Sequence, residues 1–246
     1  RNPCFKNLAA NFDFPESYTT IDLDFIVKNT ETTEIYTVGY TVVRDREPVQ
    51  THELVLNWPD YPDIDHVQFR QDLQQAADGM ARKGDVLHHT WDYLKRHGLP
   101  PMDVLKHLLD LVEGIEERKE VMILHNGWKF DAQFMMAAFH NHLGGVYEIE
   151  PDSVYDSGIM EKASQLGDAD NPLPLEHESL RDFSFRIGSL RRRGIMWALH
   201  HHCEETYGLT KLAGLKGEDA HKGGADSLLI HKLFEEHRRL AEMANG

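Results

Sequence analysis

The chain has 246 residues, and its 26 basic and 41 acidic side chains give a formal net charge of −15 at pH 7. The length and a hydrophobic content of 41% are sufficient for a buried core and exclude a disordered tail. No apolar run in the sequence is long enough for a membrane span, so we expect no membrane partner. The negative net charge also argues against a protein that binds long nucleic acid through its phosphates, because each phosphate contact needs a basic side chain.

The two cysteines, Cys4 and Cys203, lie far apart and belong to no paired pattern. Such cysteine usage is typical of a reducing compartment, and we therefore expect a cytoplasmic location. The sequence opens on Arg1 and shows no signal-peptide pattern.

The hydrophobic pattern predicts a single domain over residues 1–246, with an irregular N-terminal segment at 1–17. Strands are expected first, forming a three-stranded meander at residues 18–27, 34–43 and 49–56. A loop at 58–64 leads to helices at 67–82, 90–97 and 102–118, the last with an apolar stripe at helical spacing. Further along the chain we expect a strand at 121–124, a helix at 130–142, a strand at 146–149, an irregular insertion-like stretch at 165–195, and helices at 195–207 and 225–243. This order indicates an α/β fold with helices on the faces of a mixed sheet.

Two acids on the first predicted strand are the first candidates for chemistry. Asp22 and Asp24 alternate with Ile21 and Leu23, so both carboxylates point to one face while the apolar pair points to the core side. Two desolvated like charges call for a compensating cation, and a divalent metal ion supplies it. The alternative is a strand end at which both acids reach solvent or cap neighbouring loops.

Two further motifs carry polar groups at the ends of predicted elements. Asp131 stands where a helix begins, after the turn that follows the strand at 121–124; it either caps that helix or reaches over the edge of the sheet. His221 and Asp226 flank a pair of glycines just before the last helix. A neutral histidine can act as a general base near neutral pH, although such combinations also occur in ordinary loops.

Taken together, the three motifs form an ordered set that resembles the DEDDh 3′–5′ exonuclease family. These ribonuclease H-like nucleases include polymerase proofreading subunits, oligoribonuclease and ribonuclease T. The segment 130–138 is similar to ribonuclease T, and Tyr155-Asp156-Ser157 is similar to the Phe-Asp-Thr strand that the family carries before its final helices. The resemblance covers roughly residues 18–240, nearly the whole chain.

The resemblance implies a ribonuclease H-like fold: a mixed five-stranded sheet, an antiparallel meander plus parallel strands, with helices on both faces. It implies His221 as general base and two divalent ions, Mg²⁺ or Mn²⁺, held by Asp22, Asp24, Asp131 and Asp226. The implied activity is two-metal hydrolysis of single-stranded DNA or RNA 3′ ends, or of short oligonucleotides, to nucleoside 5′-monophosphates. Ribonuclease T-like proteins work as dimers, so a homodimer is a further expectation.

The chain departs from the family pattern at three places, and the departures at Asp24 and Phe25 motivate another function. The family usually has Glu where this chain has Asp24, Phe25-Ile26 replaces the usual Thr-Thr or Thr-Ala, and Lys129 is an extra residue before Phe130. Asp is shorter than Glu by about 1.5 Å, and Mg²⁺ tolerates little distortion. The leading alternative is therefore a catalytically weakened nuclease-fold protein that serves as a binding or scaffold module. Hydrolysis of a small phosphodiester is the third option.

Several residues around the expected site are candidates for binding substrate. Phe25 and Trp128 could stack on terminal bases or belong to the core. Asn126 and Lys129 complete the candidate set; Lys129 touches a phosphate or lies in solvent. Arg186 and residues 191–193 form a dense basic patch that guides phosphates, binds a partner or is a solvated loop.

The run His200-His201-His202-Cys203 invites a zinc interpretation. Consecutive residues on a helix point about 100° apart, so only His200 and Cys203 share a face. Two ligands do not make a closed zinc site, and we do not assign one here.

Overall fold

The structure is a computed structural model that describes residues 12–26, 34–166, 170–190, 199–216 and 219–245. Its sheet has five strands in the order β3-β2-β1-β4-β5. The strands are β1 (Tyr18–Ile26), β2 (Glu34–Arg44), β3 (Glu47–Val55), β4 (Met122–Leu124) and β5 (Val154–Asp156). β1 pairs antiparallel with β2, and β2 with β3, whereas β4 and β5 continue the sheet in parallel with β1. The predicted meander and the mixed sheet are confirmed.

The strand predicted at 146–149 is wrong. Residues 144–150 form a connection without strand pairing, and the parallel partner of β4 is the three-residue β5 further along the chain. Val146 is 84% exposed while Ile149 is buried, so this short apolar run anchors a loop at one point instead of filling a place in the sheet. A brief apolar run does not by itself distinguish a strand from an anchored loop.

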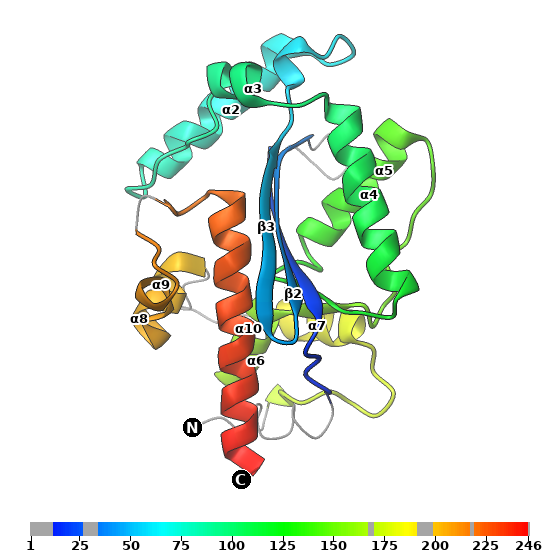
Figure 1. The fold of residues 1–246 in the computed structure, drawn as a ribbon, viewed down its shortest axis with the longest axis vertical. Coiled ribbons are helices and arrows are strands. Elements are labelled where there is room, and N and C mark those ends of the chain that lie inside the picture. Colours follow the sequence, from blue (N-terminus) through cyan, green and yellow to red (C-terminus); the bar gives the residue numbers. More distant parts are fainter. Residues whose placement is uncertain (1–11, 27–33, 167–169, 191–198, 217–218, 246) are drawn as a thin grey trace.

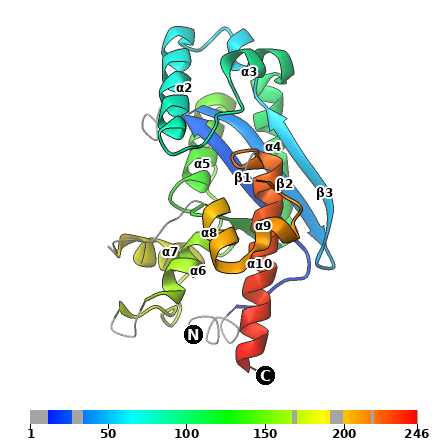
Figure 2. The same cartoon turned by 90° about the vertical axis from the view of Figure 1, so that its left-hand side faces the viewer.

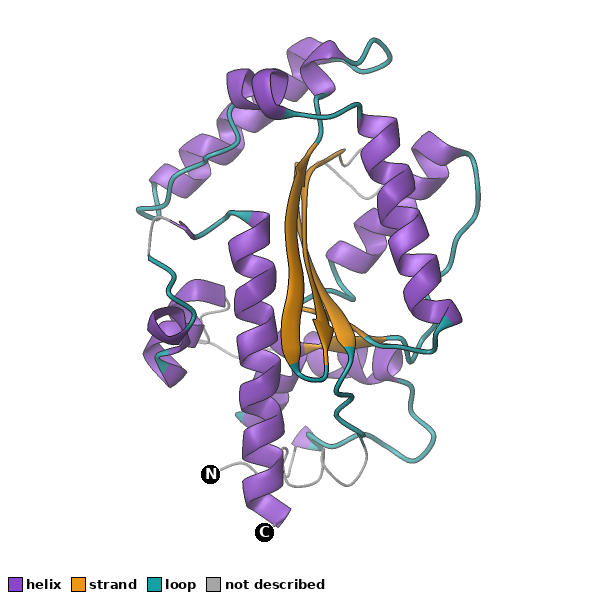
Figure 3. Cartoon of the chain, in the orientation of Figure 1, coloured by secondary structure: helices purple, strands orange, loops and turns teal. Residues whose placement is uncertain are grey.

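The helices cover both faces of the sheet, as predicted. They are α2 (His66–Ala81), α3 (Trp91–His97), α4 (Pro101–Glu117), α5 (Asp131–Leu143), α6 (Ser157–Ser164), α7 (Leu180–Ser189), α8 (Leu199–Tyr207), α9 (Leu209–Leu212) and α10 (Gly223–Asn245), with a 3₁₀ turn η1 at Trp58–Asp60. Figure 1 shows α10 along one face of the β1–β3 meander and α4 and α5 on the other. Figure 3 shows the same two-sided arrangement by element type. Within the described residues, no helix is both long and apolar enough to cross a membrane.

α10 lies unusually close to the sheet because two glycines meet there. A Cβ on Gly39 of β2 would lie only 1.9 Å from the backbone of Gly223, the first residue of α10. Just beyond, Thr20 Oγ1 donates a hydrogen bond of 2.6 Å to the Ser227 carbonyl oxygen, and Thr41 Oγ1 lies 2.9 Å from Ser227 Oγ. The first turn of α10 is therefore fixed directly against β1 and β2.

The stretch predicted as irregular at 165–195 contains a ten-residue helix, α7. Ser179 caps it, because its side chain accepts a hydrogen bond from the Asp182 N–H, and Phe183 and Ile187 on its inner face are buried. The composition of this stretch therefore gave no indication of the short amphipathic helix within it. Residues 1–11, the basic run 191–193 and residues 195–198 of the helix predicted at 195–207 lie outside the described residues.

Candidate functional site

A cleft of about 590 Å³ opens beside the carboxyl-terminal half of β1. Its walls come from that half of β1, the turn after β4, the start of α5, the α8–α9 region and the approach to α10. Figure 2 shows α8 and α9 lying beside the upper part of α10. Seven of the residues predicted from the sequence line this cleft: Asp22, Asp24, Phe25, Asn126, Asp131, His221 and Asp226.

The two acids of β1 share the face predicted for them, while Ile21 and Leu23 are buried in the core. The pairing of β1 with β2 shifts register between Asp24 and Phe25, and such a bulge re-aims the side chains beside it. Thr37 Oγ1 of β2 donates a 2.6 Å hydrogen bond to Asp24 Oδ2. β2 therefore fixes the carboxylate that stands where the family usually has the longer Glu.

Asp131, the first residue of α5, does not act chiefly as the helix cap that the sequence allowed. Its Oδ1 accepts a 3.0 Å hydrogen bond from the backbone N–H of Leu23, and its side chain is only 6% exposed. This long-range bond ties the start of α5 to the middle of β1. As a result, the third acid lies in the same cleft as Asp22 and Asp24.

Asp226, in the first turn of α10, is also 6% exposed. Its Oδ1 lies 2.6 Å from Nε2 of His200, a histidine on α8. Cys203, on the same face of α8, is buried among Leu229 and Leu233 of α10. The shared face predicted for His200 and Cys203 is therefore real, and it packs on α10.

His221 lines the cleft from the loop before α10. Its Nε2 lies 3.4 Å from Asp85 Oδ2, in the loop after α2. His221 and Asn126 both have positive φ angles, of 61° and 56°, which are uncommon for residues other than glycine. Backbone strain of this kind gathers at functional sites, and here both strained residues line the cleft.

The cleft concentrates negative charge in a desolvated place. Burial, and then the charges of Asp226 and Asp24, hold the pKa of Asp22 well above its ordinary value. Burial raises the pKa of Asp24 to about 6 despite the hydrogen bond from Thr37. Burial likewise raises the pKa of Asp131 to about 8, although the Leu23 N–H opposes the shift. Carboxylates that repel one another in this way are stabilised by a cation.

The chemistry of this donor set fits a hard divalent cation, because carboxylate oxygens are the ligands that Mg²⁺ and Mn²⁺ prefer. Within the described ranges, no three acidic, histidine or cysteine side chains are placed to hold a metal ion together as they stand. Three of the four carboxylates already accept hydrogen bonds or pair with a protein group: Asp24, Asp131 and Asp226. Each of these contacts engages one oxygen of the carboxylate.

The remaining candidate substrate-binding residues are divided between two places. Phe25 lines the cleft, with its ring 4.2 Å from that of Phe134 and 6.4 Å from that of Phe130. Trp128 does not offer its ring to a base, because it is only 1% exposed and packs in the core. Lys129 is exposed and lines a neighbouring cavity instead.

Arg186, the described part of the predicted basic patch, is already paired. Its guanidinium forms two hydrogen bonds, of 2.7 and 2.8 Å, with the Glu178 carboxylate. It also donates to the carbonyl oxygens of Asn171 and Leu173. Its role in this structure is to bind the loop before α7 to that helix, not to present a free charge to phosphates.

Several residues that contact the predicted set were not predicted from the sequence, among them His200 and Asp85. Both lie far from their partners in the chain and outside the three motifs, so no local spacing points to them. His200 was visible only as part of a histidine run. The face it shares with Cys203 was a usable signal, because a helix face with one buried residue must pack against another element.

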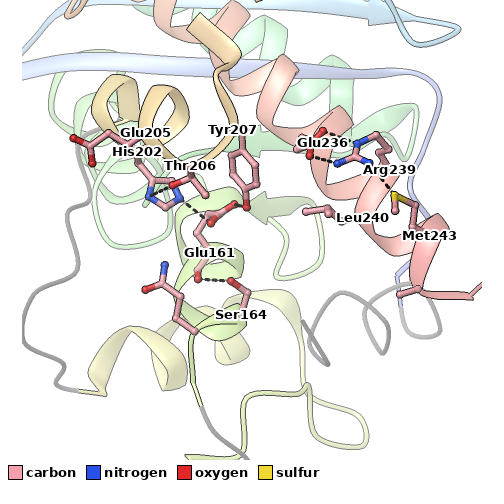
Figure 4. Close-up of a pocket in the computed structure, with 12 residues that line it drawn as sticks. Glu161, Ser164, His202, Glu205, Thr206, Tyr207, Glu236, Arg239, Leu240 and Met243 are labelled. Carbon is pink, nitrogen blue, oxygen red and sulfur yellow. Dashed lines mark hydrogen bonds and ion pairs between the residues drawn. The ribbon is translucent and has the colours of Figure 1, made fainter. Parts of the chain in front are cut away.

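Another cavity, of about 1150 Å³, lies on the far side of α8, between α6 and the end of α10 (Figure 4). At its wall the buried carboxylate of Glu161 accepts or shares hydrogen bonds with His202, Tyr207 and His237, at 2.7, 2.8 and 2.6 Å. Burial alone would raise the pKa of Glu161, but the bonds with His202 and His237 outweigh it and hold the pKa well below its ordinary value. Glu161 thus anchors α8, the helix that brings His200 to the cleft.

No known protein-family model and no curated protein sequence matches this chain. Solved structures do. The zinc-bound complex of E. coli exonuclease I with single-stranded DNA is 13% identical with a TM-score of 0.54, covering 93% of this chain and 42% of the other. The complex of E. coli exonuclease I with a dA16 oligonucleotide is 14% identical with a TM-score of 0.54, covering 93% and 43%. A product-bound exonuclease I is 12% identical with a TM-score of 0.53, covering 93% and 45%.

At these identities the likeness shows the fold. The chain has the ribonuclease H-like architecture of the exonuclease I structures, as the sequence resemblance implied. It spans less than half the length of those proteins.

Proposed function

We propose that this protein is a metal-dependent 3′–5′ exonuclease that removes nucleoside 5′-monophosphates from single-stranded nucleic acid. The observation that carries the proposal is the convergence of Asp22, Asp24, Asp131 and Asp226 in one cleft with His221. These residues come from three separate segments of the chain, and only the fold brings them together.

The exonuclease I structures support this proposal at the level of fold. Their complexes hold single-stranded DNA or dA16, and one of them contains zinc. The substrate polarity, the metal number and the identity of the ions are part of our proposal for this chain.

The chain's own residues would do three things. The four carboxylates would hold the divalent ions, with Asp24 kept in place by Thr37 and Asp131 by the Leu23 N–H. His221 would accept the proton of the attacking water, and Asp85 lies near enough to orient its ring. Phe25 would pack against the terminal nucleotide at the rim of the cleft.

When bound, the ions would supply charge stabilisation at the scissile phosphate and lower the pKa of a bound water. The histidine is needed because the proton of that water must leave near neutral pH. His200 faces the same carboxylate that the resemblance assigns to metal binding. It would act as a positioning residue that holds Asp226 on the α8 side of the cleft.

Cleavage of a single strand tests the proposal. A strand labelled at its 5′ end and incubated with Mg²⁺ or Mn²⁺ should shorten one nucleotide at a time and release 5′-monophosphates. Asp226→Asn and His221→Ala should lower this rate by at least a hundredfold, about the smallest effect expected of a lost general base, with unchanged circular dichroism. Lys106→Ala, on the exposed side of α4, is the matched control and should cleave normally.

The leading alternative, a weakened binding or scaffold protein, predicts a different outcome of the same assay. In that case the wild-type strand would persist with both ions, and Asp226→Asn would change nothing. Release of product from a dinucleotide but not from a longer strand would point instead to a small-phosphodiester hydrolase.

A further inference from the structure

A second cavity, of about 500 Å³, adjoins the cleft. The two share Asn126 and Phe130 in their walls, so the second cavity lies directly beside the cleft. The other walls come from the turn after β4, from α6 and from α7. The parts of this wall that come from α6 and α7 lie outside the three sequence motifs that define the candidate site.

Two buried hydrogen-bond donors of residues that line this cavity have no partner among the residues that the structure describes. They are Nε1 of Trp128 and Oγ of Ser184, in side chains that are 1% and 3% exposed; both residues line the cavity. By contrast, the equally buried Trp58 donates its Nε1–H to the Ile35 carbonyl oxygen at 2.6 Å. Unpartnered buried donors are rare and unfavourable, so an acceptor that reaches them is favoured. Both atoms are screened from solvent, so such an acceptor reaches them only when the side chains around them move.

Two lysines bring positive charge to the same wall. Within the described residues no carboxylate pairs with Lys129, whose Nζ lies 5.5 Å from the centroid of the Phe130 ring. Lys162 donates to the carbonyl oxygens of Gly188, at 3.0 Å, and Leu190. Burial, and then the charge of Lys129, lowers the pKa of Lys162, so the two ammonium groups act on one another. In a chain of net charge −15, this concentration of cations favours an anion.

Among the described residues, Asp156 is the one acid of this wall, and the protein's own backbone already engages its carboxylate. Asp156 accepts hydrogen bonds from the backbone N–H groups of Asn126, Trp128 and Ile159, at 2.8, 3.1 and 3.2 Å. Burial raises its pKa to about 6. Its carboxylate therefore shapes the turn that carries Trp128 and Lys129, and the groups left for a ligand are donors.

We propose that this cavity is a subsite for a phosphate of the nucleic-acid strand, close to the 3′ end held in the cleft. Lys129 would supply charge, and the Trp128 N–H and Ser184 O–H would donate to the phosphate oxygens. This inference rests on the proposed function, because it takes the strand's 3′ end to lie in the cleft. It gives Trp128 a role as a hydrogen-bond donor in place of the stacking that the sequence suggested.

The indole N–H resonances test the proposal directly, because the chain has only four tryptophans. A ¹⁵N-labelled protein would be titrated with a single-stranded hexanucleotide in EDTA, so that nothing is cleaved. Trp128→Phe assigns the Trp128 resonance and Trp58→Phe assigns the control. We expect the Trp128 resonance to move downfield and the Trp58 resonance to stay. An unmoved Trp128 resonance at saturating oligonucleotide, or one that moves with inorganic phosphate but not with the strand, would overturn the proposal.

A binding measurement locates the phosphate along the strand. Fluorescent hexanucleotides with one uncharged methylphosphonate linkage, placed at each position in turn, would be compared by anisotropy in EDTA. We expect one linkage near the 3′ end to weaken wild-type binding about tenfold, as for a charged hydrogen bond. Lys129→Ala and Ser184→Ala should lose this position dependence, while the control Lys106→Ala should keep it. Equal effects at every linkage in the wild type would contradict the subsite.

The two proposals fail in different ways. A protein that binds with the predicted position dependence but never cleaves with Mg²⁺ or Mn²⁺ retains the subsite and loses the nuclease function. A protein that cleaves from the 3′ end without any position dependence is a nuclease without this subsite.

Discussion

At the scale of single residues, the cleft depends on side chains whose charged forms are disfavoured in the free protein. Asp131 is the clearest case, because burial raises the pKa of its carboxyl to about 8 while a single backbone N–H holds it in place. A carboxyl with a raised pKa takes up a proton on folding, so its ionisation at higher pH opposes the folded state.

In the metal-free protein, the contribution of Asp131 to stability should therefore fall as pH rises from about 4, the ordinary range of an aspartate, to about 8. Asp131→Asn removes this ionisation and keeps an oxygen for the Leu23 N–H. We expect the variant to melt at a higher temperature than the wild type at pH 8 in EDTA and at nearly the same temperature at pH 5. Differential scanning calorimetry at the two pH values measures this. A lower melting temperature of the variant at pH 8 would show that the carboxylate is stabilising without a cation.

At the scale of secondary-structure elements, the site depends on how closely α10 packs on β2. Gly39 and Gly223 allow the two backbones to meet, and the first turn of α10 carries Asp226. Glu53 of β3 adds a hydrogen bond from the Gly224 N–H at 3.2 Å. Small residues at this crossing thus decide where the fourth carboxylate lies.

Gly39→Ala should push α10 away from the sheet, because its Cβ would meet backbone atoms that cannot turn aside. Overpacking of this kind costs about 1–3 kcal/mol. Gly79→Ala, on α2 with no atom within 4 Å of the added Cβ, is the matched control and should stabilise by about 0.5–1 kcal/mol. Urea unfolding of both variants gives the two free energies. Equal and small changes would mean that the contact between α10 and β2 is looser than described.

α8 is the second element on which the cleft depends, and a buried acid anchors it. Glu161→Gln removes the charged acceptor that His202 and His237 share, and a hydrogen bond to a charged group contributes about 1.5–3 kcal/mol. Glu236→Gln, whose partner Arg239 is half exposed at 53%, should cost less than about 1 kcal/mol. Because the pKa of Glu161 is lowered on folding, its stabilisation is present above the ordinary glutamate pKa and is lost as pH falls below it. If the two variants unfold at the same urea concentration at pH 7, Glu161 is not the anchor.

At the scale of the whole molecule, the net charge limits how a strand can be held. Each phosphate contact on a single strand contributes about −0.7 to the slope of log K against log salt. An acidic surface with cations at one cavity wall predicts a slope of about −1 to −2 that is the same for a hexamer and a twenty-mer. Binding of each fluorescent strand, followed by anisotropy at several salt concentrations from low to moderate, gives this slope. A slope that steepens with strand length would reveal a basic track along the surface.

The sequence predicted most of the architecture because much of it is local. The meander, the apolar stripe of α4 and the glycines before α10 follow from spacing and turn chemistry, and the four carboxylates follow from the family resemblance. The strand at 146–149 was wrong because a single buried side chain, Ile149, fixes that loop. His200 and Asp85 were missed because their places depend on packing between elements distant in the chain. The 500 Å³ cavity beside the cleft could not be predicted for the same reason, since α7 completes its wall.

We propose that the carboxylates of this cleft hold divalent ions at the 3′ end of a strand. A crystal structure with Mn²⁺ and a nucleoside 5′-monophosphate, recorded with anomalous scattering, is the decisive test. We expect two manganese peaks in the cleft, ligated by Asp22, Asp24, Asp131 and Asp226, with His221 facing the phosphate. A cleft without manganese, with the nucleotide bound elsewhere, would contradict it.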